Sequence, residues 1–209
     1  MPTDAATSIA YVGAFVGLVG GGIALFNSRK GVTWKRAELA SNYMKDFNNN
    51  PELVFASRCL DWNGGKLVIP ENLQPYMPDG VRYIEHDRQI FAKAMRPNLQ
   101  IGELSDDPRI QIYRTSMDSF LSWLSLVSSA LGRGLFLVED LQDVGYWVSK
   151  IQSEIALHGF IVSFGYQESL EKLVKFYRTR KSPYRDWTFP TNVVGMRPQS
   201  RVEETVSVL

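Results

Sequence analysis

The first apolar segment of the chain is a run of twenty residues, 7–26, that contains no charged side chain. Twenty helical residues at 1.5 Å each extend about 30 Å, which matches the hydrocarbon core of a bilayer. The leader carries Asp4 as its only charged side chain, and no small-residue cleavage site follows Phe26. These features favour a retained transmembrane helix over a cleaved signal peptide. The remaining alternative, a buried core helix in a soluble protein, would normally show a polar stripe.

Basic residues lie on the C-terminal side of this run, and that asymmetry predicts the orientation of the chain. Lys and Arg are enriched on the cytoplasmic side of transmembrane helices. We therefore expect residues 1–6 to be non-cytoplasmic and residues 27–180 to form a cytoplasmic helical domain. The basic residues that flank the run are Arg29, Lys30, Lys35 and Arg36.

Small residues recur within the run at every fourth position, which places them on one helix face. Helices in a bilayer associate through close van der Waals packing, because lipid tails are as apolar as Leu. This face therefore predicts contact with a second helix, from another copy of the chain or from a larger complex. The alternative is that Gly is simply frequent in transmembrane helices. The residues concerned are Gly13, Gly17 and Gly21, with Ala10 and Ala14 beside them.

After this run, apolar residues recur at helical spacing and predict an all-α domain. One helix begins at Pro51, a residue suited to the first helical position, with Asn50 as its N-cap. The loop over 66–80 is rich in proline and has a short extended piece at 67–69. The predicted helices cover residues 33–47, 51–62, 81–95, 108–131, 137–157 and 160–179.

The helix that begins at Pro108 is the strongest of the domain, with Asp107 or Ser105 as its N-cap and an end at Gly132 or Gly134. It is apolar over most of its circumference, which is typical of a helix in the centre of a bundle. A second membrane segment is the alternative. We reject it, because Gly-Arg-Gly interrupts the pattern and the serines of this helix would face lipid.

The expected fold class is therefore all-α: an N-terminal single transmembrane helix followed by a cytoplasmic bundle of about five or six helices. Residues 181–209 are polar and contain three prolines, so we expect an extended or disordered tail. A formal net charge of +1 gives no indication of nucleic-acid binding. The single cysteine, Cys59, excludes an intramolecular disulfide and agrees with a reducing compartment.

No catalytic, metal-binding or cofactor-binding motif occurs in the chain, and we expect no cofactor and no metal. His86 lies between Glu85 and Asp87 on a predicted helix. Adjacent helical side chains point about 100° apart, so these three cannot converge on one metal ion. Cys59 lies on the apolar side of a helix and is expected to be a packing residue.

A second group of basic residues gathers at the end of the last predicted helix, interleaved with aromatic residues. Such a group can attract anionic lipid, and the mixture of basic and aromatic residues also suits RNA or a protein partner. Cations that complement the helix dipole are the equally weighted alternative. The group consists of Lys172, Lys175, Arg178, Arg180 and Lys181.

The layout resembles a family of uncharacterised bacterial single-span membrane proteins with a helical cytoplasmic domain. The similarity lies in the anchor and in the stretches 34–40, 120–131 and 165–173. The resemblance implies a place in a bacterial inner membrane, and it implies no reaction and no catalytic residues.

These observations favour a non-enzymatic accessory or scaffold subunit of a membrane complex. Its partners would be membrane lipid and either other subunits or copies of itself, bound through the transmembrane helix, with no nucleic acid. The first alternative is a membrane-anchored enzyme or sensor whose site is built from scattered residues that a single sequence does not reveal. A deep polar pocket around Glu85, His86 and Asp87 would favour it. The second is an effector that binds anionic lipid surfaces through the two basic groups.

Overall fold

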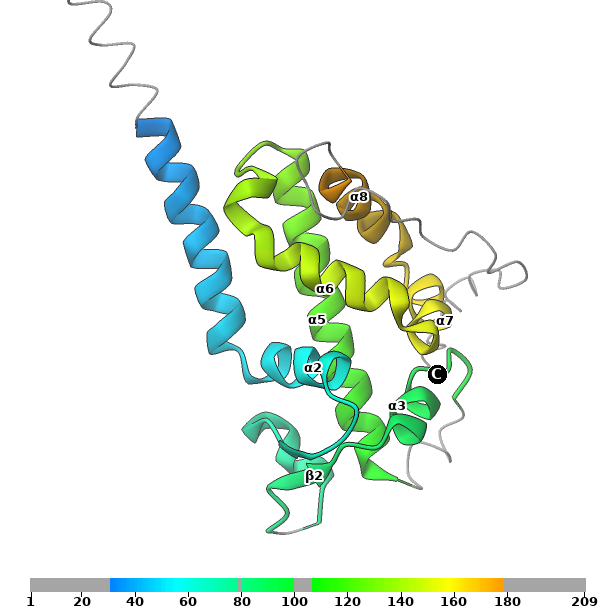
Figure 1. Cartoon of the computed structure of the whole chain (residues 1–209). Coiled ribbons are helices and arrows are strands. Elements are labelled where there is room, and N and C mark those ends of the chain that lie inside the picture. Colours follow the sequence, from blue (N-terminus) through cyan, green and yellow to red (C-terminus); the bar gives the residue numbers. More distant parts are fainter. Residues whose placement is uncertain (1–30, 79, 100–106, 179–209) are drawn as a thin grey trace, which may run out of the picture.

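The computed structural model describes residues 31–78, 80–99 and 107–178, which are mostly helical (Figure 1). This confirms the all-α class. No helix within these ranges is long and apolar enough to cross a membrane. The expected transmembrane segment and tail lie outside the described residues. The same holds for Gly13, Gly17, Gly21, Ala10, Ala14, Arg29, Lys30, Arg180 and Lys181.

The first described helix covers residues 31–49, and we call it the leading helix. The later helices are α2 (Pro51–Asp61), α3 (Arg88–Ala94), α5 (Pro108–Gly132), α6 (Gln142–Ser153), α7 (Ile155–Ser163) and α8 (Gln167–Tyr177). Two short 3-10 helices are η1 (Glu71–Tyr76) and η2 (Val138–Leu141). Strands β1 (Lys66–Val68) and β2 (Tyr83–Glu85) pair as an antiparallel hairpin.

Helix α5 lies at the centre of the bundle, as its apolar circumference predicts. It packs against α2, α3, α8 and η1, and at 25 residues it extends about 37 Å. Phe120, Leu121 and Leu124 are fully buried. The backbone N–H of Arg109 donates to the Asp107 carboxylate at 3.0 Å, so Asp107 is the N-cap. The helix ends at Gly132, as expected.

Helix α2 begins where cap chemistry predicts. The side-chain oxygen of Asn50 accepts hydrogen bonds from the backbone N–H groups of Glu52 at 3.0 Å and Leu53 at 3.4 Å. Pro51 occupies the first helical position, where its missing N–H costs nothing. The predicted start of this helix is therefore confirmed.

The helix predicted over 81–95 is partly wrong, because residues 83–85 form strand β2. Ile84 pairs with Leu67 of β1, and both side chains are buried. The helix begins only after Asp87, whose carboxylate accepts the N–H groups of Gln89 at 2.7 Å and Ile90 at 3.2 Å. Pairing with β1, which helical periodicity does not report, decides the conformation of these residues.

Residues 137–178 contain three α-helices, α6, α7 and α8, where the pattern predicts two. A predicted helix over 137–157 is broken at Glu154, and one over 160–179 is broken at Gly165. Gly165 has a φ of +79°, a left-handed conformation that glycine adopts readily. Ile151 and Leu157 are buried on either side of the break at Glu154. The helical spacing of apolar residues continues across Glu154, so the sequence pattern gives no sign of this break.

The leading helix confirms the prediction over 33–47 and packs on the bundle through its C-terminal half. The ring centroid of Phe47 lies 4.9 Å from that of Trp123 and 6.0 Å from that of Phe120. Tyr43 contacts Phe136 edge to face at 5.2 Å. The beginning of the helix projects beyond the bundle (Figure 1), and there Trp34 is 77% exposed.

Candidate functional site

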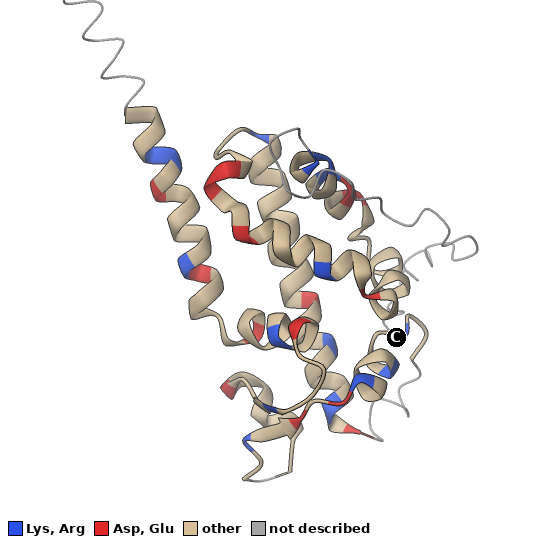
Figure 2. Cartoon of the chain, viewed as in Figure 1, with Lys and Arg blue, Asp and Glu red and all other residues tan. Residues whose placement is uncertain are grey.

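The basic residues predicted from the sequence lie on two separate elements. Lys35 is exposed and Arg36 half-buried on the leading helix, whereas Lys172 and Lys175 are exposed on α8 (Figure 2). Arg178 is half-buried and follows the last residue of α8, where a cation complements the negative end of the helix dipole. The two groups therefore do not merge into one patch within the described residues.

A pocket of about 420 Å³ between α5 and α8 brings Lys172 together with Arg133. The Lys172 ammonium lies 2.7 Å from the Glu168 carboxylate, and both side chains are largely exposed. Such an exposed i,i+4 pair contributes little and leaves the ammonium free to turn toward another anion. The lining residues are Ser128, Ser129, Gly132, Arg133, Ser169, Lys172 and Phe176.

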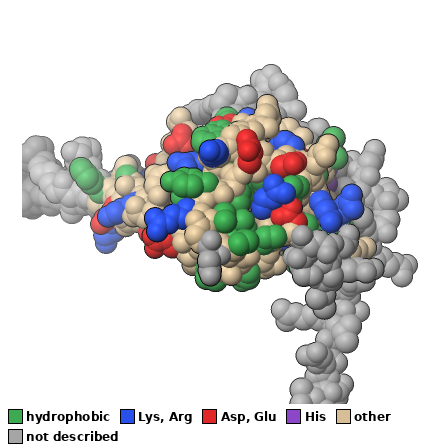
Figure 3. Space-filling model, turned by 90° about the horizontal axis from the view of Figure 1, so that it is seen from below, with side chains coloured by type: hydrophobic (Ala, Val, Ile, Leu, Met, Phe, Trp, Pro, Cys, Tyr) green, Lys and Arg blue, Asp and Glu red, His purple; other side chains and the backbone are tan. Residues whose placement is uncertain are grey.

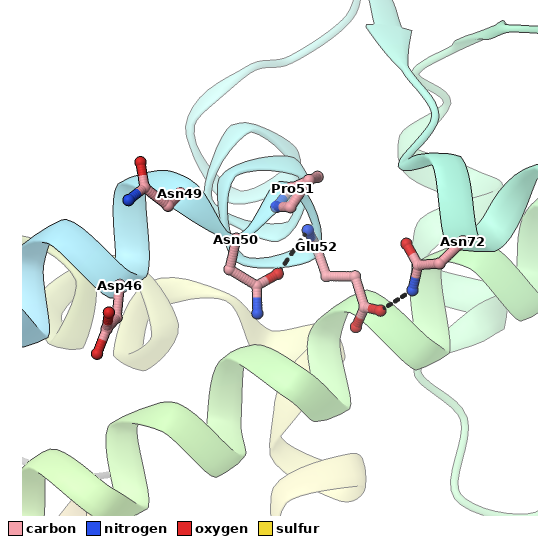
Figure 4. Close-up of a pocket in the computed structure, with 6 residues that line it drawn as sticks. All are labelled: Asp46, Asn49, Asn50, Pro51, Glu52 and Asn72. Atoms are coloured by element: carbon pink, nitrogen blue, oxygen red, sulfur yellow. Dashed lines mark hydrogen bonds between the residues drawn. The ribbon is translucent and has the colours of Figure 1, made fainter.

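A second pocket, of about 390 Å³, lies at the junction of the leading helix and α2 (Figure 4). The Glu52 carboxylate in this pocket is already hydrogen-bonded within the protein. The Glu52 carboxylate accepts one hydrogen bond from the side-chain amide of Asn72 on η1 and another from the hydroxyl of Ser119 on α5. Figure 4 shows Asp46 and Asn49 turned away from Glu52. The arrangement therefore ties three elements together rather than presenting converging groups to a ligand.

His86 lies at the end of β2, in the core, and not on a helix as the sequence pattern predicts. Its side chain is only 4% exposed. The ring atom Nδ1 lies 3.0 Å from the hydroxyl oxygen of Tyr113, which also accepts the backbone N–H of Asp87 at 3.3 Å. If the Tyr113 hydroxyl donates to Nδ1, the imidazole is neutral with its proton on Nε2. The Nε2 atom is buried and has no hydrogen-bond partner among the described residues.

The electrostatics agree with a neutral histidine. The pKa of His86 is lowered mainly by burial, and the nearby positive charge of Arg88 lowers it further. Burial likewise raises the pKa of Tyr113, so both groups stay uncharged near neutral pH. Glu85 and Asp87, which flank His86 in the sequence, are exposed and half-buried respectively, and Asp87 is used as the cap of α3. No group of three or more His, Cys, Asp or Glu side chains in the described ranges could hold a metal ion.

Cys59 is a packing residue, as predicted. Its side chain is 1% exposed on α2, and burial raises the pKa of its thiol. The reactive form of cysteine is the thiolate. A buried, protonated thiol of this kind is inert.

The outer face of the hairpin carries an exposed apolar pair beside the charged pair Lys66 and Glu85. Leu67 and Ile84 point into the core, while their neighbours Val68 and Tyr83 face each other across the strands and are 53% and 57% exposed. Viewed from this end of the molecule, apolar side chains gather between charged ones (Figure 3). Tyr76 on the adjoining η1 is 49% exposed. These residues are available for contact with another macromolecule.

Comparisons of the chain with protein-family models, with curated proteins and with solved structures found no match.

Sequence reasoning identified Lys172 but missed the residues that surround it. In the sequence, Arg133 stands out only within a Gly-Arg-Gly helix break, and Ser129 only as one of the serines of that helix. A signal was available in their spacing: Ser129 and Arg133 are four residues apart, as are Lys172 and Phe176, so each pair shares a helix face.

Proposed function

We propose that this chain is a membrane-anchored accessory or scaffold subunit of a larger membrane complex, with its helical domain on the cytoplasmic side. The observation that carries the proposal is the start of the leading helix. Trp34, 77% exposed, and the exposed Lys35 stand on a projecting helix that closely follows the uncharged run 7–26. An exposed Trp beside basic residues is typical of a segment at the membrane–water interface.

The leading helix is suited to act as a rigid spacer between a membrane anchor and the bundle. Its nineteen described residues, 31–49, extend about 28 Å. Its far end is held by the aromatic cluster of Phe47, Phe120 and Trp123. A helix fixed in this way would hold the domain at a defined distance and orientation relative to its anchor.

The exposed apolar side chains of the hairpin support a role in protein contact. In Figure 1 the hairpin lies at the opposite end of the molecule from the start of the leading helix. If the leading helix approaches the membrane, the hairpin that carries Val68 and Tyr83 lies at the far end of the domain, where a partner on the cytoplasmic side could reach it. Aromatic residues are enriched at protein interfaces.

The test is purification of the tagged full-length protein from its native membrane in a mild detergent, followed by particle sizing and mass spectrometry. We expect recovery in a defined particle with other subunits at fixed stoichiometry. Recovery as a lone monomer would refute the subunit proposal, and recovery in the soluble fraction would refute the anchor.

Two pairs of variants locate the contacts. Gly17→Leu should release the partner if the small-residue face packs in the bilayer, whereas Val19→Leu, about 200° around the same expected helix, should not. Tyr83→Ser should weaken a contact at the hairpin, whereas Ile155→Ser, which removes an apolar side chain that is 79% exposed elsewhere, should leave it intact. Equal effects within a pair would count against that contact.

A further inference from the structure

We propose that the pocket between α5 and α8 binds a phosphate group carried by a phosphate monoester. The observation is that two cations, Arg133 at the end of α5 and Lys172 on α8, meet at a pocket lined by serine hydroxyl groups. Two of these hydroxyls have no hydrogen-bond partner within the part of the chain that the structure describes. The proposal concerns the described domain alone and holds whether or not the chain is anchored in a membrane.

The turn after α5 places Arg133 at the rim of the pocket. Gly134 has a φ of +68°, and its N–H donates to the carbonyl of Leu131 at 3.0 Å, while the N–H of Leu135 donates to the carbonyl of Ala130 at 3.0 Å. This Schellman arrangement satisfies carbonyls at the negative end of the helix. The Arg133 side chain makes no hydrogen bond or ion pair within the described residues, so its guanidinium is available to an anion.

Helix α8 supplies the opposite wall. Ser169, Lys172 and Phe176 follow one another at spacings of three and four residues, which puts them on one helix face. The hydroxyl of Ser128 on α5 donates to the carbonyl of Ser169 at 2.9 Å and fixes the two helices relative to each other. The two walls are therefore held in register by a direct hydrogen bond.

The donor set suits a phosphate better than a cation. Among the described residues, no carboxylate lines the pocket, and the hydroxyls of Ser129 and Ser169 make no hydrogen bond there. Arg can bind a phosphate through two parallel hydrogen bonds, and Lys adds a point charge. The Phe176 ring adds an apolar wall for the organic part of an ester. A volume of about 420 Å³ lies within the usual range for small-molecule sites.

The phosphate could be soluble or part of a lipid headgroup. In Figure 1 the end of α5 is directed toward the end of the molecule where the leading helix begins. In Figure 2 basic residues are visible both at the turn after α5 and on α8. A headgroup could therefore reach the pocket if the leading helix approaches a membrane.

The test is isothermal titration calorimetry of the full chain in a neutral detergent. The three probes are inorganic phosphate, glycerol 3-phosphate and a short-chain phosphatidic acid in neutral micelles, with phosphatidylcholine micelles as the blank. We expect saturable binding of at least one phosphate monoester. Binding of glycerol 3-phosphate supports a soluble source, and binding of phosphatidic acid alone supports a headgroup.

Variants decide whether the pocket is responsible. Arg133→Gln and Lys172→Gln should each weaken binding about tenfold or more, because each removes a charge-assisted hydrogen bond. Lys175→Gln, the matched control, removes the same charge from α8 at a residue outside the pocket lining and should change binding less than threefold. Absence of saturable binding for all three probes, or an equal loss in the Lys175 variant, would overturn the proposal. Circular dichroism of each variant verifies that it is folded.

Discussion

Replacement of Tyr113 by Phe removes one oxygen atom from the centre of the buried polar network. The Tyr113 side chain is 1% exposed, and its hydroxyl serves both His86 Nδ1 and the backbone N–H of Asp87. A phenyl ring keeps the edge-to-face contacts of the tyrosine ring with Phe91 and His86. The substitution therefore tests the hydrogen bonds with little change in packing.

The expected loss of stability follows from the two groups that lose their partner, His86 Nδ1 and the backbone N–H of Asp87. Leaving a buried acceptor without its partner costs about 1–3 kcal/mol, and the Asp87 N–H, being only partly buried, can recover part of its loss through water. We therefore expect the free energy of unfolding to fall by about 2 kcal/mol. For a domain of this size, that corresponds to a decrease of roughly 4–8 °C in Tm.

The measurement is urea unfolding followed by circular dichroism, together with a thermal scan. Tyr43→Phe is the matched control, because Tyr43 is half-buried and contacts Phe136 through its ring, while its hydroxyl makes no hydrogen bond within the described residues. The control should change the free energy of unfolding by less than about 0.5 kcal/mol. If Tyr113→Phe is equally neutral, the network does not stabilise the fold and the reasoning is refuted.

Three further predictions concern caps, turns and pH. Asn50→Ala should lower the free energy of unfolding by about 1 kcal/mol through loss of the α2 cap, and Asn49→Ala, which removes no cap, is its control in urea unfolding. Gly134→Ala should destabilise by about 1 kcal/mol because of its φ of +68°. Gly132→Ala should be nearly neutral, since a Cβ there would meet the Phe176 ring at an ordinary 4.0 Å; equal losses in thermal scans would contradict this. Because the folded-state pKa of His86 is lowered, the unfolded chain takes up the proton first as pH falls. The neutral His86 side chain should therefore contribute its full stabilisation above about pH 6.5. Below that pH the free energy of unfolding should fall by up to about 1.4 kcal/mol per pH unit, until the folded-state pKa of His86 is reached. A His86→Gln variant that shows the same pH slope would refute the assignment.

Local chemistry explains why some elements could be predicted. The pairs Asn50-Pro51 and Asp107-Pro108 start α2 and α5 through contacts that span at most three residues, and all the necessary atoms are adjacent in the sequence. The central place of α5 was equally predictable, because a helix that is apolar on most sides buries its side chains only when other elements surround it.

Other elements depend on partners far along the chain. Ile84 is a strand residue because Leu67 lies opposite it, and no pattern within 81–95 reports that pairing. The same is true of the candidate pocket. Lys172 could be singled out as one of a group of cations, but its meeting with Arg133 requires α8 to lie along the end of α5.

The sequence by itself determined the helical class, the caps, the inert cysteine and the uncharged run that predicts an anchor, because each depends on composition or on neighbours within a few residues. Only the tertiary structure decided that His86 is a buried partner of Tyr113 and that Arg133 and Lys172 face one pocket. Those relations arise from the packing of helices that are distant in the sequence, where the lowest free energy is set by the whole core and not by any single segment.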